Sequence, residues 1–355
     1  NHPSVANSLN NLAELLMGQG KYAAAEPLYR RSLAIYEKNL GADHPDVANI
    51  LNNLTDLLTI QGKYAAAEPL CRRSLAIAEK ALGSTHLDVA RALNNLAQLL
   101  SRQGMLTAAE PLYRRSLAIR EQKLGALASQ SFSQGARRGQ KRGPDQPSVG
   151  SILNNLALLL ERRGQYAAAE SLYHRSLAIA EKALGLNHPD VASILNNLAE
   201  FLTVQGKYAA AESLYRRSLA ITEKALGPNH PDVANSLNNL AELLRSRGQY
   251  SSAEPLSRRS LAIYEKALGP THPDVATSLN NLAALLSNQG RYTAAEPLYR
   301  RALLIKEKAL GTNHPDVALS LNNLAGILSQ QGRYLAAEPL YRRSLAIDEI
   351  AHGPD

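Results

Sequence analysis

The sequence predicts an all-α fold in which pairs of helices repeat along the chain and stack into a solenoid. Two observations carry this prediction. A segment opened by His2 recurs every 42 residues at His44 and His86, so one leading residue, eight copies and one insert account for all 355 residues. Each copy also contains two stretches whose apolar residues follow the spacing of one helix face. Because neither helix can bury its apolar face alone, stacking of copies is the expected solution.

The first stretch of each copy predicts a helix, called helix A here, over about residues 3–19 of the first copy. Its apolar residues lie at i, i+3, i+4 and i+7, and these are Leu9, Leu12, Ala13 and Leu16. Pro3 suits a first helical turn, and Gly20, which recurs in all eight copies, ends the helix. Residues at the same position in different copies form a column of the repeat. We expect Leu12, Leu96 and Leu240, which share one column, to be buried.

The second stretch predicts helix B over about residues 22–40, ended by Gly41, which is again glycine in every copy. Its apolar face includes Tyr29, and most tyrosines of the chain fall in the two columns that begin at Tyr22 and Tyr29. Both columns are therefore interpreted as packing residues, and Cys71, which replaces tyrosine in the second, as a small core residue. Pro27 and its counterparts lie past the first turn of helix B, where a slight bend is expected.

The repeat also sets the predicted domain organisation. Residues 1–125 hold repeats 1–3, residues 126–143 form an insert, and residues 144–355 hold repeats 4–8 of one continuous solenoid. The insert is rich in Gly, Ser and Gln and contains four basic residues and no acid, so we expect a basic flexible loop. A plain flexible loop is favoured over a binding element.

The residues of each copy resemble a known family. The runs Leu9-Asn-Asn-Leu-Ala, Gln19-Gly-Lys-Tyr and Ala25-Glu-Pro-Leu-Tyr are similar to a tetratricopeptide repeat. The 42-residue period, with His-Pro-Asp-Val-Ala opening a unit and Glu-Lys-Ala-Leu-Gly closing it, resembles the kinesin light chain subtype, which also occurs in bacterial and notably cyanobacterial proteins. The resemblance implies a right-handed superhelix of sixteen helices, with helix A on the concave face and a role in binding protein segments.

Catalytic and metal-binding chemistry is not expected. The histidines that open successive copies lie on neighbouring helices, which pack about 8–10 Å apart, whereas zinc ligands lie about 2 Å from the ion. They are interpreted as helix-start residues. The recurring Ser32 column has no histidine partner in its own unit, and the sequence has no Gly-x-x-x-x-Gly-Lys-Ser/Thr motif. We therefore predict a protein without enzymatic activity, metal or cofactor.

The positive charge is distributed by the repeat. The net charge is +8, and each copy has a basic pair in helix B whose first member lies four residues after a glutamate, a favourable helical spacing. The second member has no such partner, which predicts a solvated outer face and makes nucleic-acid binding unlikely. This column comprises Arg31, Arg73, Arg115, Arg175, Arg217, Arg259, Arg301 and Arg343.

Composition also bears on the compartment. The single cysteine fits a reducing environment, and the chain has no apolar run of the roughly 18 residues that a membrane helix needs. We expect a cytoplasmic protein without membrane association. The chain does not begin with Met, which suggests an excerpt or a processed chain.

Two asparagine columns on helix A are the predicted ligand-binding residues. One column comprises Asn10, Asn52, Asn94, Asn154, Asn196, Asn238, Asn280 and Asn322, and the other comprises Asn11, Asn53, Asn95, Asn155, Asn197, Asn239, Asn281 and Asn323. Asparagine is a mediocre helix former, but its amide offers both a donor and an acceptor, so a ladder of amides can hold the backbone of an extended peptide. Hydrogen bonding between adjacent helices and recent duplication of the repeat stay open as alternatives. Groove asparagines of kinesin light chains and co-chaperone repeats favour the ligand role, by resemblance.

Charge varies along the predicted groove. Arg91, Arg102 and Arg162 lie on the helix A faces of repeats 3 and 4, where Glu161 is the nearest groove acid and can offset one of them at most. Arginine presents a planar fork suited to carboxylates. The sequence therefore predicts a scaffold whose groove binds an extended or helical peptide, with a preference for acidic segments near repeats 3–4. The main alternative is a structural module that associates with itself through uncapped end repeats.

Overall fold

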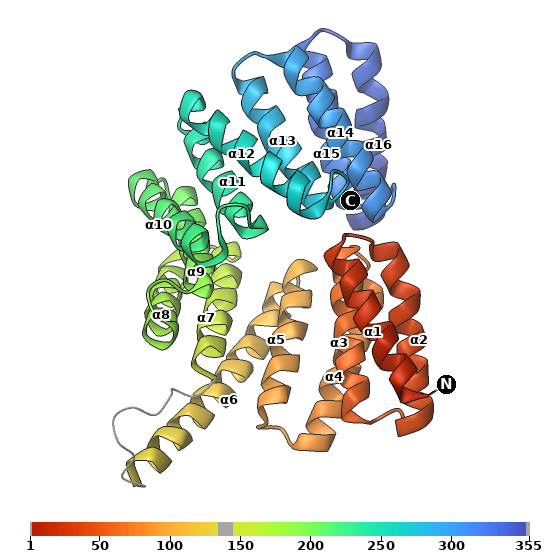
Figure 1. The fold of residues 1–355 in the computed structure, drawn as a ribbon, viewed down its shortest axis with the longest axis vertical. Coiled ribbons are helices and arrows are strands. Elements are labelled where there is room, and N and C mark those ends of the chain that lie inside the picture. Colours follow the sequence, from red (N-terminus) through yellow and green to blue (C-terminus); the bar gives the residue numbers. More distant parts are fainter. Residues whose placement is uncertain (1, 134–144, 353–355) are drawn as a thin grey trace. The chain divides into compact units, whose positions relative to one another are not determined.

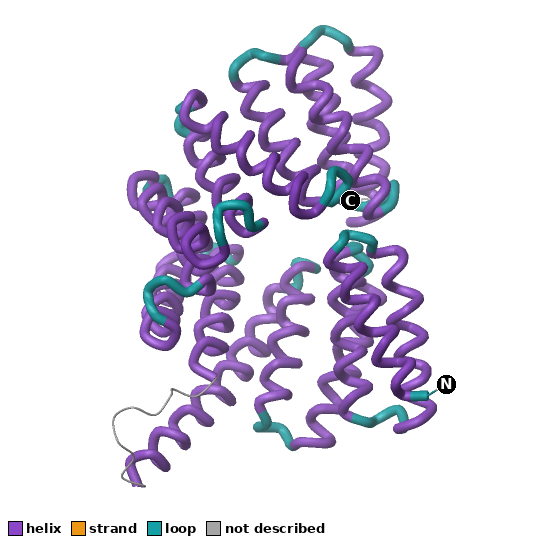
Figure 2. The backbone as a smooth tube through the Cα atoms, in the orientation of Figure 1, coloured by secondary structure: helices purple, strands orange, loops and turns teal. Residues whose placement is uncertain are grey.

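The computed structural model describes residues 2–133 and 145–352, and within these ranges it contains sixteen α-helices and no strand (Figures 1 and 2). The all-α prediction is confirmed. The helices are α1 (Pro3–Gly18), α2 (Tyr22–Leu40), α3 (Pro45–Ile60), α4 (Tyr64–Leu82), α5 (Leu87–Arg102), α6 (Leu106–Ser133), α7 (Asp145–Arg162), α8 (Tyr166–Leu184), α9 (Pro189–Val204), α10 (Tyr208–Leu226), α11 (Pro231–Ser246), α12 (Tyr250–Leu268), α13 (Pro273–Asn288), α14 (Tyr292–Leu310), α15 (Pro315–Gln330) and α16 (Tyr334–His352). None of these helices is long and apolar enough to cross a membrane.

The helices group into two packed units. The first comprises Asn1–Glu14 and Glu26–Ile221, and the second comprises Leu15–Ala25 and Thr222–Asp355. Within each unit, helix B of one copy packs against helix A of the next, as α4 does against α5 and α14 against α15. A single continuous solenoid over all eight repeats stays a prediction.

Short local signals set the helix ends. Gly62, between α3 and α4, has a φ of 71°, in the left-handed region that favours glycine. This turn lets the Lys63 amide donate to the Leu58 carbonyl over 2.8 Å, which satisfies an orphan carbonyl at the end of α3. Helix B runs without interruption through its internal proline, as α4 does through Pro69.

The histidine column caps helix A, as the sequence predicts. In α3 the Nδ1 atom of His44 accepts a hydrogen bond of 3.2 Å from the Asp46 amide. An acceptor at this position satisfies one of the free amides of the first turn. The same cap occurs at His86, His188, His230, His272 and His314.

A serine column joins the two helices of every copy except the seventh, which has Ala302 at this position. The Ser74 hydroxyl, which is buried, donates to the Ala48 carbonyl over 3.2 Å, and Ser116 donates to the Ala90 carbonyl over 2.6 Å. The same bond is made by Ser32, Ser176, Ser218, Ser260 and Ser344. These hydroxyls therefore hold helix B against helix A, which agrees with the rejection of a serine nucleophile.

The predicted core is confirmed in part. Leu96 and Leu240 are each 1% exposed, but Leu12 is 46% exposed, so the prediction of its burial is wrong. Leu96 lies on α5, against which α4 of the preceding copy packs. Leu12 lies on α1, which is the first helix that the structure describes.

The tyrosine columns also differ from expectation. Tyr29 is buried, and Cys71, which replaces tyrosine in that column, is fully buried with its pKa raised to about 12, first of all by burial. The first column packs less well than predicted, because Tyr166, Tyr208 and Tyr334 are exposed.

The insert differs from the predicted loop. Helix α6 continues through Ser133, so residues 126–133 are helical, while residues 134–143 lie outside the described residues. Gly125 lies within the helix, whereas the equivalent Gly83 has a φ of 82° and ends α4. Glycine permits either conformation, and the residues that follow it here, Ala126 and Leu127, are strong helix formers.

Candidate functional site

The two asparagine columns are joined to each other between copies. The Asn53 amide donates to Asn10 Oδ1 over 2.9 Å, Asn155 donates to Asn94 Oδ1 over 3.2 Å, and Asn197 donates to Asn154 Oδ1 over 3.1 Å. Each bond links helix A of one copy to helix A of the copy before it. Hydrogen bonding between adjacent helices, one of the alternatives left open by the sequence, is therefore observed. A ligand would meet an amide ladder that is already ordered by these bonds.

The two columns differ in accessibility. In the Asn10 column, Asn238 and Asn280 are buried and Asn322 is exposed, while Asn10, Asn52, Asn94, Asn154 and Asn196 are half-buried. In the Asn11 column, Asn11 itself is exposed and the rest are half-buried, namely Asn53, Asn95, Asn155, Asn197, Asn239, Asn281 and Asn323. The Asn11 column contains no buried member and is therefore the more accessible of the two.

Glu14 lies beside the two asparagine columns where repeat 1 meets repeat 2. The Glu14 carboxylate accepts hydrogen bonds from Asn10 over 2.9 Å and from Asn53 over 3.0 Å. At the equivalent positions of repeats 3 and 4, the residues are Gln98 and Leu158. The amides of these two repeats thus have no carboxylate from that column beside them.

A pocket between repeats 3 and 4 brings together part of the predicted site. It has a cavity volume of about 340 Å³ and is lined by Gln98, Ser101, Arg102, Tyr113, Asn155, Leu158, Leu159 and Arg162. None of these lining residues carries a carboxylate. The Arg162 guanidinium donates to the Ser101 carbonyl over 3.3 Å, while Arg102 makes no hydrogen bond or ion pair with any residue that the structure describes.

Two acids lie near this pocket without an ion pair to its arginines. Burial raises the pKa of Glu161, whose carboxylate accepts a 3.0 Å hydrogen bond from the Tyr173 hydroxyl, and the Arg162 charge lowers that pKa only in part. Burial likewise raises the pKa of Asp56, and the Arg102 charge opposes the rise. Both arginines therefore keep capacity for an external carboxylate.

Arg91 is not part of this cluster, which corrects the predicted group of three arginines. It lies eleven residues before Arg102 on the same helix, and a rise of about 1.5 Å per residue separates the two by roughly 16 Å. Its guanidinium pairs with Asp88 over 3.0 Å and donates to Asn49 over 3.5 Å. The sequence reasoning missed Asp88, although its spacing of three residues on one helix signals the pair.

The outer arginine column is also corrected by the structure. From repeat 2 onward, the second arginine of each basic pair forms an ion pair with a glutamate in helix B of the preceding copy. The sequence predicted no partner for this arginine. The pairs are Arg73–Glu37 (2.6 Å), Arg115–Glu79 (2.7 Å), Arg175–Glu121 (2.5 Å), Arg217–Glu181 (2.6 Å), Arg259–Glu223 (2.7 Å), Arg301–Glu265 (2.6 Å) and Arg343–Glu307 (2.5 Å). Because a carboxylate neutralises each of these cations, the column is a poor surface for nucleic-acid phosphates.

Metal-ligating side chains do not gather in the described part of the chain. Among residues whose side chains are described, no group of three or more His, Cys, Asp or Glu could hold a metal ion. The basic insert residues Arg137, Arg138, Lys141 and Arg142 fall outside the described residues.

The fold and site can be compared with known proteins. BtubC (BKLC) from P. vanneervenii is 22% identical with a TM-score of 0.54, over 68% of this chain and 93% of that protein. A variant of a kinesin light chain-like protein with nearly identical TPR-like repeats, from Podospora anserina, is 27% identical with a TM-score of 0.50, over 59% of this chain and 99% of the other. The apo form of RapI is 13% identical with a TM-score of 0.51, over 97% of both chains.

Sequence profiles give the family directly. One profile described as tetratricopeptide repeat matches residues 4–69, 56–122, 190–266, 252–303 and 274–350, and a second one matches residues 149–190. No curated protein matches the sequence. The profiles cover well over half of the chain, and the structural neighbours include kinesin light chain-like repeat proteins. The chain therefore belongs to the tetratricopeptide repeat family.

Proposed function

We propose that this protein is a scaffold without catalytic activity that binds a peptide segment of a partner protein along the helix A surface of its repeats. Tetratricopeptide repeat proteins are generally protein-interaction scaffolds that bind proteins or peptides. The peptide is extended or helical and lies along the predicted concave groove. It has an acidic segment that reaches repeats 3 and 4.

The observation that carries the acidic preference is the pocket shared by Arg102 and Arg162. Two guanidinium groups line one cavity of about 340 Å³ without a carboxylate among the lining residues. Both arginine side chains are exposed, so a carboxylate from solvent can reach them, and two cations beside one cavity attract it more strongly than one does. A charge-assisted contact of this kind is also stronger than a neutral hydrogen bond.

The asparagine ladder supports a role in holding the peptide backbone. Asn155 lines the same pocket. Its amide donates one hydrogen to Asn94, and its other hydrogen and its oxygen can bond a ligand. We extend this role to both columns, with the more accessible Asn11 column as the main contact. Arg91, already paired with Asp88, contributes less than the other two arginines.

Titration of short peptides tests this proposal. A labelled Glu-rich peptide, its Gln counterpart and its Lys counterpart are titrated against the wild type and the Arg102→Ala/Arg162→Ala variant. We expect the Glu-rich peptide to bind best, and the variant to lose about 1–3 kcal/mol of that binding.

The matched control removes two charges elsewhere. Arg72→Ala/Arg114→Ala changes two exposed arginines of helix B that pair within their own helix with Glu68 and Glu110. An equal loss of binding free energy in both variants, or tighter binding of the Lys peptide, would show that the pocket does not select acidic peptides.

Self-association is a second candidate function, favoured by the apolar surface of α16. Leu335 is 92% exposed and Ile350 is 73% exposed, and Leu345 and Tyr341 are exposed as well. Exposed apolar patches on soluble proteins commonly mark contact sites. Light scattering over a concentration series tests it: an increase in mean mass that Leu335→Lys/Ile350→Lys abolishes supports association, and a constant mass rejects it.

A further inference from the structure

One variable column of helix B controls the space between successive repeats. It comprises Tyr36, Ala78, Arg120, Ala180, Thr222, Tyr264, Lys306 and Asp348 in repeats 1 to 8. Tyr36 and Tyr264 are each only 7% exposed, so in repeats 1 and 6 a phenol ring is packed at this position. Repeats 2 and 4 have alanine instead, which removes the ring.

The surroundings of Tyr36 define what this space accepts. Its hydroxyl donates to Asn7 Oδ1 on helix A of the same copy. Burial, and then the charge of Asp46 at the start of the next helix A, raise its pKa. Burial, and then the charge of Asp274 of the next copy, likewise raise the pKa of Tyr264. In repeat 7, Lys306 points the same way and lies 3.6 Å from Asp316.

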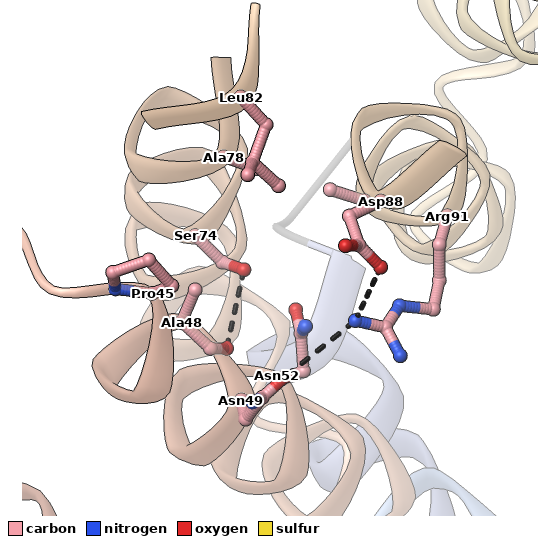
Figure 3. A pocket seen from close by; sticks show the side chains of 10 residues that line it. Pro45, Ala48, Asn49, Asn52, Ser74, Ala78, Leu82, Asp88 and Arg91 are labelled. Carbon is pink, nitrogen blue, oxygen red and sulfur yellow. Dashed lines mark hydrogen bonds and ion pairs between the residues drawn. The ribbon is translucent and has the colours of Figure 1, made fainter. Parts of the chain in front are cut away.

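In repeat 2 the same space is an open pocket, shown in Figure 3. It has a cavity volume of about 90 Å³ and lies among α3, α4 and α5, lined by Pro45, Ala48, Asn49, Asn52, Ser74, Ala78, Leu82, Asp88, Arg91 and Ala92. Asn49 is the counterpart of Asn7, and Asp88 is the counterpart of Asp46. The pocket therefore keeps the counterparts of Asn7 and Asp46, both of which contact Arg91, and lacks the ring of Tyr36.

The pocket also holds an unsatisfied acceptor. Asn52 Oδ1 is buried, and no residue that the structure describes donates a hydrogen bond to it. Because that atom has almost no accessible surface, the acceptor within reach of a ligand is Asn49 Oδ1, which belongs to an exposed side chain and accepts a long 3.5 Å bond from Arg91. The walls of the pocket include the apolar side chains of Ala48, Ala78 and Leu82. A ligand group that suits this pocket is thus flat and apolar and carries one hydroxyl donor.

We propose that the pocket of repeat 2 binds a tyrosine side chain of a partner peptide, with its hydroxyl donating to Asn49 Oδ1, as Tyr36 donates to Asn7 in repeat 1. The bound ring takes the place that Tyr36 fills in repeat 1. The assignment of the ring to a peptide rests on the proposed scaffold function, but the pocket and its chemistry do not. A related pocket of about 240 Å³ occurs in repeat 4 around Ala180, where Ser151 stands at the position of Asn49.

The test uses p-cresol, the side-chain analogue of tyrosine, and full-length protein with labelled alanine methyl groups. We expect saturable shifts of the Ala78 and Ala48 methyl signals, with a dissociation constant on the order of 1 mM for so small a ligand. Toluene, which lacks the hydroxyl, should bind at least about fivefold more weakly, because it cannot donate to Asn49.

Three variants make the result specific. Ala78→Tyr introduces the residue that repeats 1 and 6 already carry, and it should abolish the Ala48 shift. Ala180→Tyr makes the identical change in the same column of repeat 4 and should leave the Ala48 shift intact. Asn49→Ala keeps the ring space and should remove most of the preference for p-cresol over toluene.

The outcomes separate this inference from the proposed function. Unchanged Ala78 and Ala48 signals at saturating p-cresol, or equal shifts in wild type and Ala78→Tyr, would overturn the tyrosine pocket even if the Glu-rich peptide binds. Binding of p-cresol at Ala78 upholds the pocket even if that peptide does not bind at Arg102 and Arg162. If Ala78→Tyr does not fold, the Asn49→Ala comparison decides alone.

Discussion

At the scale of single residues, the columns that recur in most copies have partners inside the protein. His44 caps a helix, Ser74 joins helix A to helix B, and Arg73 reaches a glutamate of the preceding copy. Each contact repeats because both of its partners repeat. The columns that vary, such as those of Glu14 and Tyr36, line the spaces that a ligand could enter.

Glutamates of helix B should make stability dependent on acid. A hydrogen bond from Arg258 lowers the pKa of Glu254 below its ordinary value of 4.5, and Arg300 does the same for Glu296. A lowered folded-state pKa means that the stabilisation is present above the unfolded-state pKa and is lost as pH falls through the folded one. We expect the urea midpoint to fall from pH 5 towards pH 3.

A pair of variants in one column checks that dependence. Glu254→Gln should flatten the pH dependence, because Arg258 and Arg291 of the next copy both contact Glu254. Glu338→Gln changes a residue at the same position of the last copy, whose carboxylate pairs with Arg342 alone and is 58% exposed. It should leave the dependence close to wild type. Identical slopes for all three proteins would refute the assignment.

One leucine column offers a direct measure of burial. Leu96→Ala should lower the free energy of unfolding by about 2–5 kcal/mol, since the side chain is 1% exposed. Leu12→Ala makes the same change where the side chain is 46% exposed, and should cost less than about 1 kcal/mol. Urea denaturation of both variants provides the comparison, and similar losses would contradict it.

At the scale of helices, the sequence predicts boundaries well because their signals are local. Helix A was expected over about 3–19 and helix B over about 22–40, and the structure has Pro3–Gly18 and Tyr22–Leu40. The failure at α6 has a local cause too, because a glycine permits a stop but does not impose one. Prediction of the site was less complete. The Asn53–Asn10 and Arg73–Glu37 contacts join residues about one repeat apart, and their pairing depends on how the copies stack.

Two glycines should respond oppositely to alanine. Gly83 ends α4 with a φ of 82° and a ψ of 156°, a region that essentially only glycine adopts and that costs another residue about 1–3 kcal/mol, so Gly83→Ala should lower the melting temperature. Gly18 is the last residue of α1, and a Cβ added there would meet no atom within 4 Å, so Gly18→Ala should stabilise by up to roughly 0.5 kcal/mol. Thermal unfolding followed by circular dichroism tests the pair, and a shift of the same sign for both would contradict this account.

At the scale of the molecule, most described links between repeats join nearest neighbours, and the exception is the segment Leu15–Ala25 of repeat 1, which belongs to the second packed unit. The asparagine ladder, the outer ion pairs and the packing of helix B on the next helix A each connect one copy to the following one. Stability in such an array is approximately a sum of terms for single repeats and for adjacent pairs. A defect in one repeat should therefore weaken its neighbours and leave distant repeats folded.

Hydrogen exchange measured on Leu96→Ala tests this locality. Leu96 lies on α5, which packs against α4 and α6, and α6 in turn packs against α7. Because the lost packing is shared only among these helices, we expect amide protection to fall most in α4 to α7, and little in α13 to α16. Leu12→Ala, in which little packing is lost, serves as the control. If protection fell equally from α3 to α16 in Leu96→Ala, unfolding would be cooperative over the whole chain, and the nearest-neighbour account would be wrong.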